Sequence, residues 1–192
     1  MNSTVTITDI CHRFDWREMF GNDHPVELDL GAGDGGFAIA YAKQHPEINL
    51  LAVERLLGRV RKIEKRSVRG SLANVHVLRL ETSYTVRYLL PPDSVSVAHI
   101  MFPDPWPKRR HWPRRLMQPD FVRDLAAALK PGGELRFTTD HKDYFETAQQ
   151  AVTDAGVLHR AETWDFSNDP KTDFQQTFDA EGRATYRARW IK

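Results

Sequence analysis

The segment 102–111 reads Phe-Pro-Asp-Pro-Trp-Pro-Lys-Arg-Arg-His and carries the densest chemistry in the chain. Asp104 stands between Pro103 and Pro105, and each proline fixes its own φ and restricts the residue before it. Trp106 follows as a stacking surface, and the nearby cations are Lys108, Arg109, Arg110, Arg114 and Arg115. An aromatic ring beside cations suits an unstacked nucleotide. We interpret the segment as a nucleotide-binding loop with a rigidly held carboxylate. The alternative is a proline-stiffened surface loop with solvated charges.

A second candidate site is a glycine-rich turn that follows the predicted strand 26–30. Gly31, Gly33 and Gly36 match the pattern G-x-G-x-x-G, in which glycines allow a tight turn and a close approach to a ligand. Glu54 ends the next apolar run, where a carboxylate can accept hydrogen bonds from both hydroxyls of an adenosine ribose. That ribose is part of both NAD and S-adenosyl-L-methionine (SAM), so the turn alone does not choose between them.

Asp29, two residues before the first glycine, favours SAM. A carboxylate at this point suits the amino-acid part of SAM, whereas it would repel the pyrophosphate of NAD. The alternative is a strand-turn-helix corner whose glycines serve packing alone.

The elements that must position these residues alternate in the manner of parallel βαβ units. Strands are predicted at 26–30, 50–54, 75–80, 95–102 and 134–139, and a late strand, for which an antiparallel place at an edge is one option, at 185–191. Helices are predicted at 36–45, 56–69, 83–90, 119–130 and 142–155. Both candidate sites then lie at the carboxyl edge of one sheet, where open α/β sheets bind their ligands.

The predicted helix after the second strand is strongly basic. Between residues 55 and 69 the only acidic residue is Glu64, and the cations are Arg55, Arg59, Arg61, Lys62, Lys65, Arg66 and Arg69. Such a run is either a solvated face or a surface that contacts phosphates. We favour phosphate contact, although the whole chain has a net charge of only +1.

Length and composition limit the remaining possibilities. The 192 residues fit one domain, 1–192, with a short segment 1–24 before the core. The single cysteine, Cys11, excludes an internal disulfide. The histidine spacing predicts no metal site. The absence of a signal-like N-terminus and of a long apolar run predicts a cytoplasmic protein without a membrane segment.

The quoted residues resemble one family, the bacterial tRNA (guanine-N7)-methyltransferases. The resemblance begins near Trp16 and rests above all on the Phe-Pro-Asp-Pro-Trp block. It also includes 16–22, the glycine turn, 52–54, 118–121, 129–133, 138–140 and 172–174. It implies a class I, Rossmann-like α/β methyltransferase with a mostly parallel seven-stranded sheet and helices on both faces. The implied cofactor is SAM, and the implied substrate is guanosine 46 in the variable loop of tRNA. The sequence leaves open whether the protein is a monomer or a homodimer.

The resemblance also implies roles for individual residues. The residues around SAM would be Asp29, Gly31, Gly33, Glu54, Glu81 and Asp104, with Asp104 also catalytic. The residues that contact the guanosine would be Lys108, Asp140, Thr172 and Gln175. Guanine N7 has a free lone pair, so the reaction needs alignment and electrostatic stabilisation rather than a strong base. The alternative role for Asp140 is the N-cap of the helix that follows it.

The chain departs from the family pattern in three places. Glu81 replaces the usual aspartate, and Gln175 replaces the glutamate that closes a Thr-x-x-Glu segment. Relatives often carry a longer basic N-terminal extension, so weaker tRNA binding or help from a partner is expected. Two other functions therefore remain open: a catalytically weakened tRNA-binding member of the same fold and, more distantly, an NAD-dependent oxidoreductase.

Overall fold

The structure, a computed structural model, describes residues 4–5, 12–162 and 166–192, so Cys11 lies outside the described residues. Its strands are β1 (Thr4–Val5), β2 (Val26–Leu30), β3 (Asn49–Val53), β4 (Val75–Leu78), β5 (Val95–Met101), β6 (Leu129–Thr139), β7 (His159–Arg160) and β8 (Tyr186–Ile191). Its α-helices are α1 (Trp16–Phe20), α2 (Gly36–Gln44), α3 (Leu57–Arg69), α4 (Thr82–Tyr84), α5 (Pro119–Ala128), α6 (Lys142–Ala155) and α7 (Asp173–Ala180). A π-helical turn, η1 (Thr85–Leu89), continues α4, and a 3-10 helix, η2 (Arg109–Arg114), follows β5.

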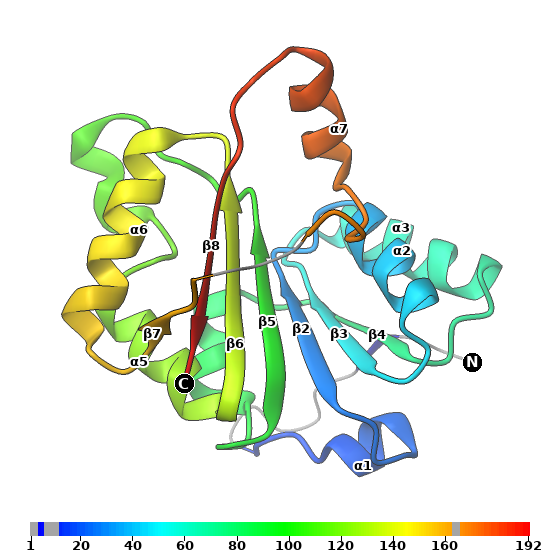
Figure 1. Cartoon of the computed structure of the whole chain (residues 1–192). Coiled ribbons are helices and arrows are strands. Elements are labelled where there is room, and N and C mark those ends of the chain that lie inside the picture. The colour runs from blue at the N-terminus through cyan, green and yellow to red at the C-terminus, as the bar shows by residue number, and fades with distance from the viewer. Residues whose placement is uncertain (1–3, 6–11, 163–165) are drawn as a thin grey trace.

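The strands form one sheet in the order β1-β4-β3-β2-β5-β6-β8-β7 (Figure 1). Strands β1 to β6 pair in parallel, whereas β8 is antiparallel to both β6 and β7. Every residue of β2 and β3 is buried, because helices cover both faces of the sheet. The prediction of a mostly parallel α/β sheet is confirmed.

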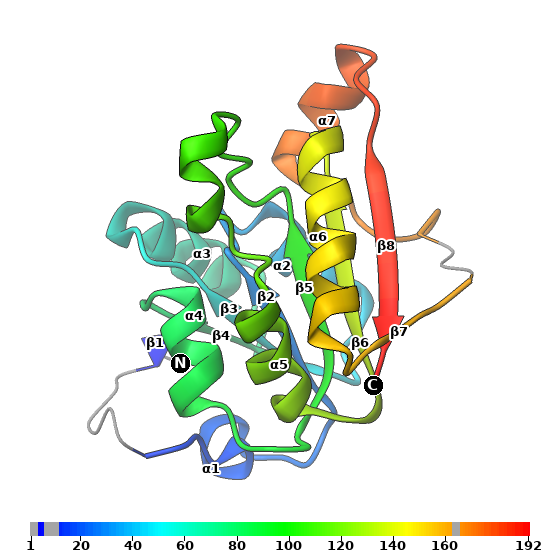
Figure 2. The same cartoon turned by 90° about the vertical axis from the view of Figure 1, so that its left-hand side faces the viewer.

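Two hydrophobic clusters occupy the two faces of the sheet. One packs the sheet against α5, α6 and η1, with Phe121, Leu125 and Tyr144 among its members. The other packs it against α2 and α3 and includes Phe37 and Ile63. Figure 2 shows α5 and α6 on one side of the sheet and α2 on the other. The sheet is therefore held rigidly between two layers of helices.

The strand order reverses direction at β2, which lies between β3 and β5. The glycine turn follows β2, Glu54 follows β3, and the Pro-Asp-Pro loop follows β5. Because these strands are parallel, all three segments leave the same edge of the sheet. The sheet thus supplies a ligand-binding crevice at its topological switch point.

The structure corrects several predicted elements. The sheet has eight strands instead of seven, because β1 and β7, with two residues each, are too short to give a sequence pattern. Strand β8 is antiparallel as expected, but β7 covers it, so it is not the edge strand. The predicted helix 83–90 is the short α4 followed by the π-helical η1. The five-residue α1 and the eight-residue α7 were not predicted.

Candidate active site

The glycine turn after β2 has an unusual backbone. Gly31, Gly33 and Gly35 have φ of 86°, 56° and 79°, a region that favours glycine. A Cβ at Gly35 would lie 2.6 Å from Cγ1 of Ile63, so α3 packs directly on the turn. The third glycine that this geometry requires is therefore Gly35, whereas the sequence pattern singled out Gly36, the first residue of α2.

Glu54 connects the turn to the end of β3. Its Oε2 accepts a hydrogen bond from the Gly33 N–H at 3.1 Å, and its Oε1 accepts one from the Leu56 N–H at 2.8 Å. The residue is only 5% exposed, and Arg59 Nη1 lies 3.7 Å from Oε2. The carboxylate is thus fixed in orientation, and each oxygen keeps a lone pair for a further donor.

Asp29 is the most perturbed acid of the site. Its side chain is buried, and its Oδ2 has no hydrogen-bond partner among the described residues. Burial raises the pKa of Asp29 to about 7, and the negative charge of Glu54 adds to that increase. A buried carboxyl group without a partner, next to a second carboxylate, is a site for a cationic ligand group.

Several cations of the basic helix α3 contact the glycine turn. Lys62 Nζ lies 2.7 Å from Asp34 Oδ2, and Arg66 Nη1 donates to the Asp34 carbonyl at 2.8 Å. The hydrogen bond from Lys62 lowers the pKa of Asp34. Arg59 lies 3.8 Å from the same carboxylate. Arg59, Lys62 and Arg66 are therefore already engaged with the glycine turn, which the count of cations along the sequence did not show.

A neighbouring face of α3 carries a stripe of exposed cations. Arg61, Lys65 and Arg69 recur every four residues, so they share one face of the helix. None of them makes an ion pair with another residue in the part of the chain that the structure describes. These three residues, which we call the outer stripe, are the cations of α3 that are free to bind phosphates.

The Pro-Asp-Pro loop is bounded by two strained residues. Phe102 has a φ of 52° and Trp106 a φ of 43°, in the left-handed region that non-glycine residues rarely occupy. Strain of this kind collects at functional sites. Asp104, between them, is exposed and forms no hydrogen bond or ion pair with another described residue. The loop therefore presents a free carboxylate, as its sequence predicted.

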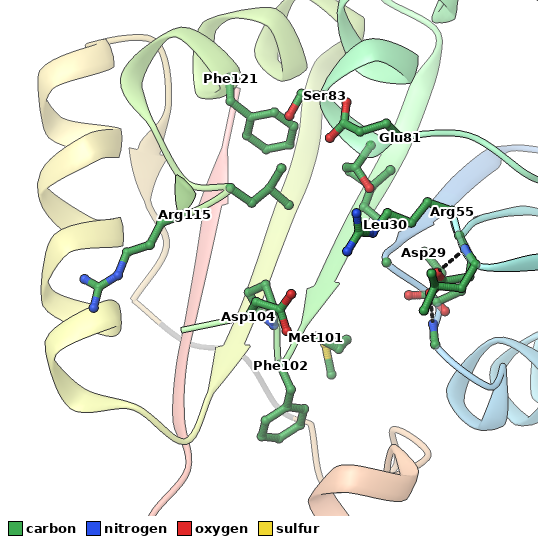
Figure 3. Close-up of a pocket in the computed structure, with 18 of the residues that line it drawn as sticks. Asp29, Leu30, Arg55, Glu81, Ser83, Met101, Phe102, Asp104, Arg115 and Phe121 are labelled. Atoms are coloured by element: carbon green, nitrogen blue, oxygen red, sulfur yellow. Dashed lines mark hydrogen bonds between the residues drawn. The ribbon is translucent and has the colours of Figure 1, made fainter. Parts of the chain in front are cut away.

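Arg115 fastens this loop to the rest of the fold by hydrogen bonds. It is 3% exposed, and its Nε donates to the Pro105 carbonyl at 2.8 Å while Nη1 donates to Thr147 Oγ1 at 2.7 Å. Its guanidinium carbon lies 4.5 Å from the Trp112 ring centroid and 4.8 Å from that of Tyr144. Figure 3 shows it pointing away from the other labelled side chains, toward α6. The prediction that Arg115 binds phosphate is wrong, because the residue is buried in the fold.

One cavity of about 910 Å³ joins the two sequence motifs. The predicted site residues that line it are Asp29, Gly31, Gly33, Glu54, Glu81, Asp104 and Thr172. In Figure 3, Asp104 and Asp29 come to it from different strand ends. Sequence reasoning did not identify several other lining residues, among them Arg55, Leu56, Ser83, Phe121 and Phe174. Lys108, Asp140 and Gln175 are not part of the lining.

Glu81 has a local structural role. Its Oε2 accepts a hydrogen bond from the Tyr84 N–H at 2.7 Å, which makes it the N-cap of α4. Glutamate is longer than the aspartate that the family pattern has at this position, and here it bends back to cap the helix. The carboxylate still lies at the cavity wall.

The C-terminal site residues belong to the start of α7. The Thr172 hydroxyl accepts from the Gln175 N–H at 2.9 Å, so Thr172 is the N-cap of α7 and Gln175 occupies its third position. Both residues are less than 10% exposed. Asp140 is not the N-cap of α6, since His141 holds that position. The Asp140 carboxylate instead pairs with Arg183.

No group of three or more His, Cys, Asp or Glu side chains within the described ranges is arranged to hold a metal ion. No helix in the same part of the chain is both long and apolar enough to cross a membrane.

Comparisons with known proteins agree with this geometry. A family model described as "Putative methyltransferase" matches residues 23–188. The 16S rRNA methyltransferase KamB has a similar structure, with a TM-score of 0.68 at 18% identity over 91% of each chain. The fold and the site define a class I, Rossmann-like SAM-dependent methyltransferase.

Curated relatives specify the family. The tRNA (guanine-N(7)-)-methyltransferase of Exiguobacterium sp. is 34% identical over 90% of this chain and 82% of its own. The enzyme of the same name from Myxococcus xanthus is 33% identical over 93% of this chain and 88% of its own. The chain belongs to the tRNA (guanine-N(7)-)-methyltransferase family. This membership gives no support to an NAD-dependent oxidoreductase.

Proposed function

We propose that this chain transfers the methyl group of SAM to N7 of guanosine 46 in the variable loop of tRNA, as a cytoplasmic enzyme. The observation that carries the proposal is the continuous cavity between the glycine turn and Asp104. A cofactor held at the turn and a base held at the Pro-Asp-Pro loop would face each other across it. The names of the relatives supply the base and the atom.

The residues of the turn fit SAM. Glu54, fixed by two backbone N–H groups, can accept from the ribose hydroxyls. The unpartnered Oδ2 of Asp29 can receive the ammonium group of the methionine part. A Cβ at Gly31 or Gly33 would meet no atom within 4 Å, so both face open space that a ligand can fill. When bound, SAM supplies an electrophilic methyl group that guanine N7 can take with its lone pair, without losing a proton.

The remaining task is to hold the base and to stabilise the positive charge that it gains. Asp104 is suited to this task because its free carboxylate projects into the cavity from a strained, clamped loop. A preorganised negative group beside a developing cation is the electrostatic form of catalysis. Asp140, at the end of the neighbouring strand β6, is the second carboxylate proposed to contact guanine.

Two groups of exposed cations support binding of the tRNA backbone. One is the outer stripe of α3, and the other is Lys108, Arg109 and Arg110 of the η2 region. Phosphate contacts of this kind supply much of the affinity of nucleic-acid complexes. Local clusters thus compensate for an overall charge of only +1.

The test supplies SAM with a labelled methyl group and unmodified tRNA, followed by nuclease digestion and mass spectrometry. We expect labelled 7-methylguanosine from the variable loop, and no label in a tRNA whose guanosine 46 is replaced by adenosine. Label on another base, or on another atom of guanine, would refute the proposal. A folded protein that binds tRNA and SAM without turnover would instead identify a catalytically weakened member of the family.

A further inference from the structure

Arg183 forms a contact that no sequence motif predicts. The residue follows α7, and its Nη2 donates to Oδ2 of Asp140, which lies just beyond β6. The same guanidinium carbon lies 4.0 Å from the centroid of the Phe178 ring. Its Nη1 is 3.7 Å from Glu181 Oε2. One side chain therefore ties Asp140 to helix α7.

The contact continues to the Asp104 loop through aromatic rings. Phe178 packs edge-on against Phe102 with ring centroids 5.5 Å apart, and Phe174 stacks on Phe178 at 6.1 Å. Phe102 is the strained residue that leads into Pro103 and Asp104. In Figure 3, Phe102 lies next to the helix drawn below it, α7 in the colours of Figure 1. The path Asp140, Arg183, Phe178, Phe102 thus joins the two carboxylates proposed to contact guanine.

The Asp140 carboxylate has one oxygen left for a ligand. Oδ2 is engaged by Arg183, whereas Oδ1 makes no hydrogen bond or ion pair within the described part of the chain. The Watson–Crick edge of guanine carries N–H donors, and a carboxylate oxygen held in one orientation can accept from them. The side chain of Asp140 is 13% exposed, so little solvent competes for this oxygen.

We propose that Arg183 is a positioning residue for guanine recognition. It holds Asp140 with Oδ1 directed to the base, and it keeps α7 docked on the Asp104 loop through Phe178. This inference rests on the proposed function and adds to it a residue outside the family motifs. Arg183 acts through Asp140 and not on N7, because a cation at N7 would oppose the charge that the purine acquires.

The experiment is a double-mutant cycle with Arg183→Ala, Asp140→Asn and the double variant, assayed by steady-state kinetics on tRNA. We expect Arg183→Ala to lower kcat/KM for tRNA by about tenfold, the loss of one charge-assisted contact. The dissociation constant for SAM should stay within about twofold, because Arg183 lies outside the cavity lining. In the Asp140→Asn background the Arg183 substitution should have a smaller effect than in the wild type, because only the docking of α7 through Phe178 remains to be lost.

Arg187→Ala is the matched control. Arg187 also stacks on a phenylalanine of the C-terminal segment, with its guanidinium carbon 3.9 Å from the Phe166 centroid, and no proposed site residue forms an ion pair with it. Its turnover should remain near that of the wild type. A wild-type kcat/KM in Arg183→Ala, or fully additive effects in the cycle, would overturn the role of Arg183 and leave the proposed function standing. A wild-type protein that makes no 7-methylguanosine would overturn the proposed function and this inference together.

Discussion

Asp29→Asn should stabilise the ligand-free protein above pH 7 and weaken its binding of SAM. In the folded protein the pKa of Asp29 is about 7, against an ordinary value of 3.8. Between these two values the folded state keeps a proton that the unfolded chain has released. Stability therefore falls as the pH rises through this window, and the full loss is reached above pH 7. Asparagine keeps the shape of the side chain and removes the titration.

The size of the effect follows from the two pKa values. Each unit of pKa difference corresponds to about 1.4 kcal/mol. About two units of the window lie above pH 5, so the free energy of unfolding of the variant, relative to that of the wild type, should rise by about 3 kcal/mol between pH 5 and pH 8. The measurement is urea unfolding of both proteins across that range, without SAM. Asp34→Asn is the control in the same turn, because the pKa of Asp34 is lowered and its charge is constant across the range.

The pH dependence of SAM affinity is a second test of Asp29, because it depends on the ionised form of the carboxyl group. If only the ionised Asp29 accepts the ammonium group, wild-type affinity should rise about eightfold from pH 6 to pH 7.5, the change in the ionised fraction for a pKa of about 7. Asp29→Asn should bind SAM weakly at both pH values. A stability difference between wild type and variant that does not change with pH would refute the reasoning.

Three further predictions concern the loop, the basic helix and the start of α7. Asp104→Asn should lower turnover by about 10²-fold or more while SAM binding, measured by calorimetry, changes little. Replacing the outer stripe with glutamine should weaken tRNA binding and reduce its salt dependence by up to about one counterion per residue; an unchanged slope in filter binding would mean that the face is only solvated. Thr172→Ala should remove the cap of α7, speed hydrogen exchange at the Gln175 amide and lower turnover, whereas Gln175→Glu should raise turnover by up to about tenfold in steady-state kinetics.

The sequence was sufficient to predict the central strands and the carboxyl-edge site, because both leave strong local signals. Apolar runs of five to seven residues become the buried strands β2, β3 and β5. The two prolines that flank Asp104 restrict the backbone of the loop that carries this carboxylate. The short strands β1 and β7 and helix α1 leave no comparable signal, since two to five residues cannot display a period. Their positions depend on tertiary pairing.

The roles of individual cations were the least predictable part of the site. A count of charges along α3 cannot separate Lys62, paired with Asp34, from Lys65, which faces solvent. The direction of each side chain depends on how α3 packs on the glycine turn, and that packing is set by the contact of Gly35 with Ile63. Arg115 and Arg114 are neighbours in sequence, yet one is buried and the other exposed.

The division of cations into inner and outer sets explains how a nearly neutral chain can hold both a cationic cofactor and a polyanion. The inner cations Arg59, Lys62 and Arg66 are bound to Asp34 or Glu54, so the turn keeps its shape and Asp29 remains without a positive partner. In the function proposed here, Asp29 therefore stays available to the ammonium group of SAM. The outer stripe pairs with no acid in the described part of the chain and would be available to phosphate. We infer that one face of α3 stabilises the cofactor site while another offers charge to tRNA, which a uniformly solvated helix would not do.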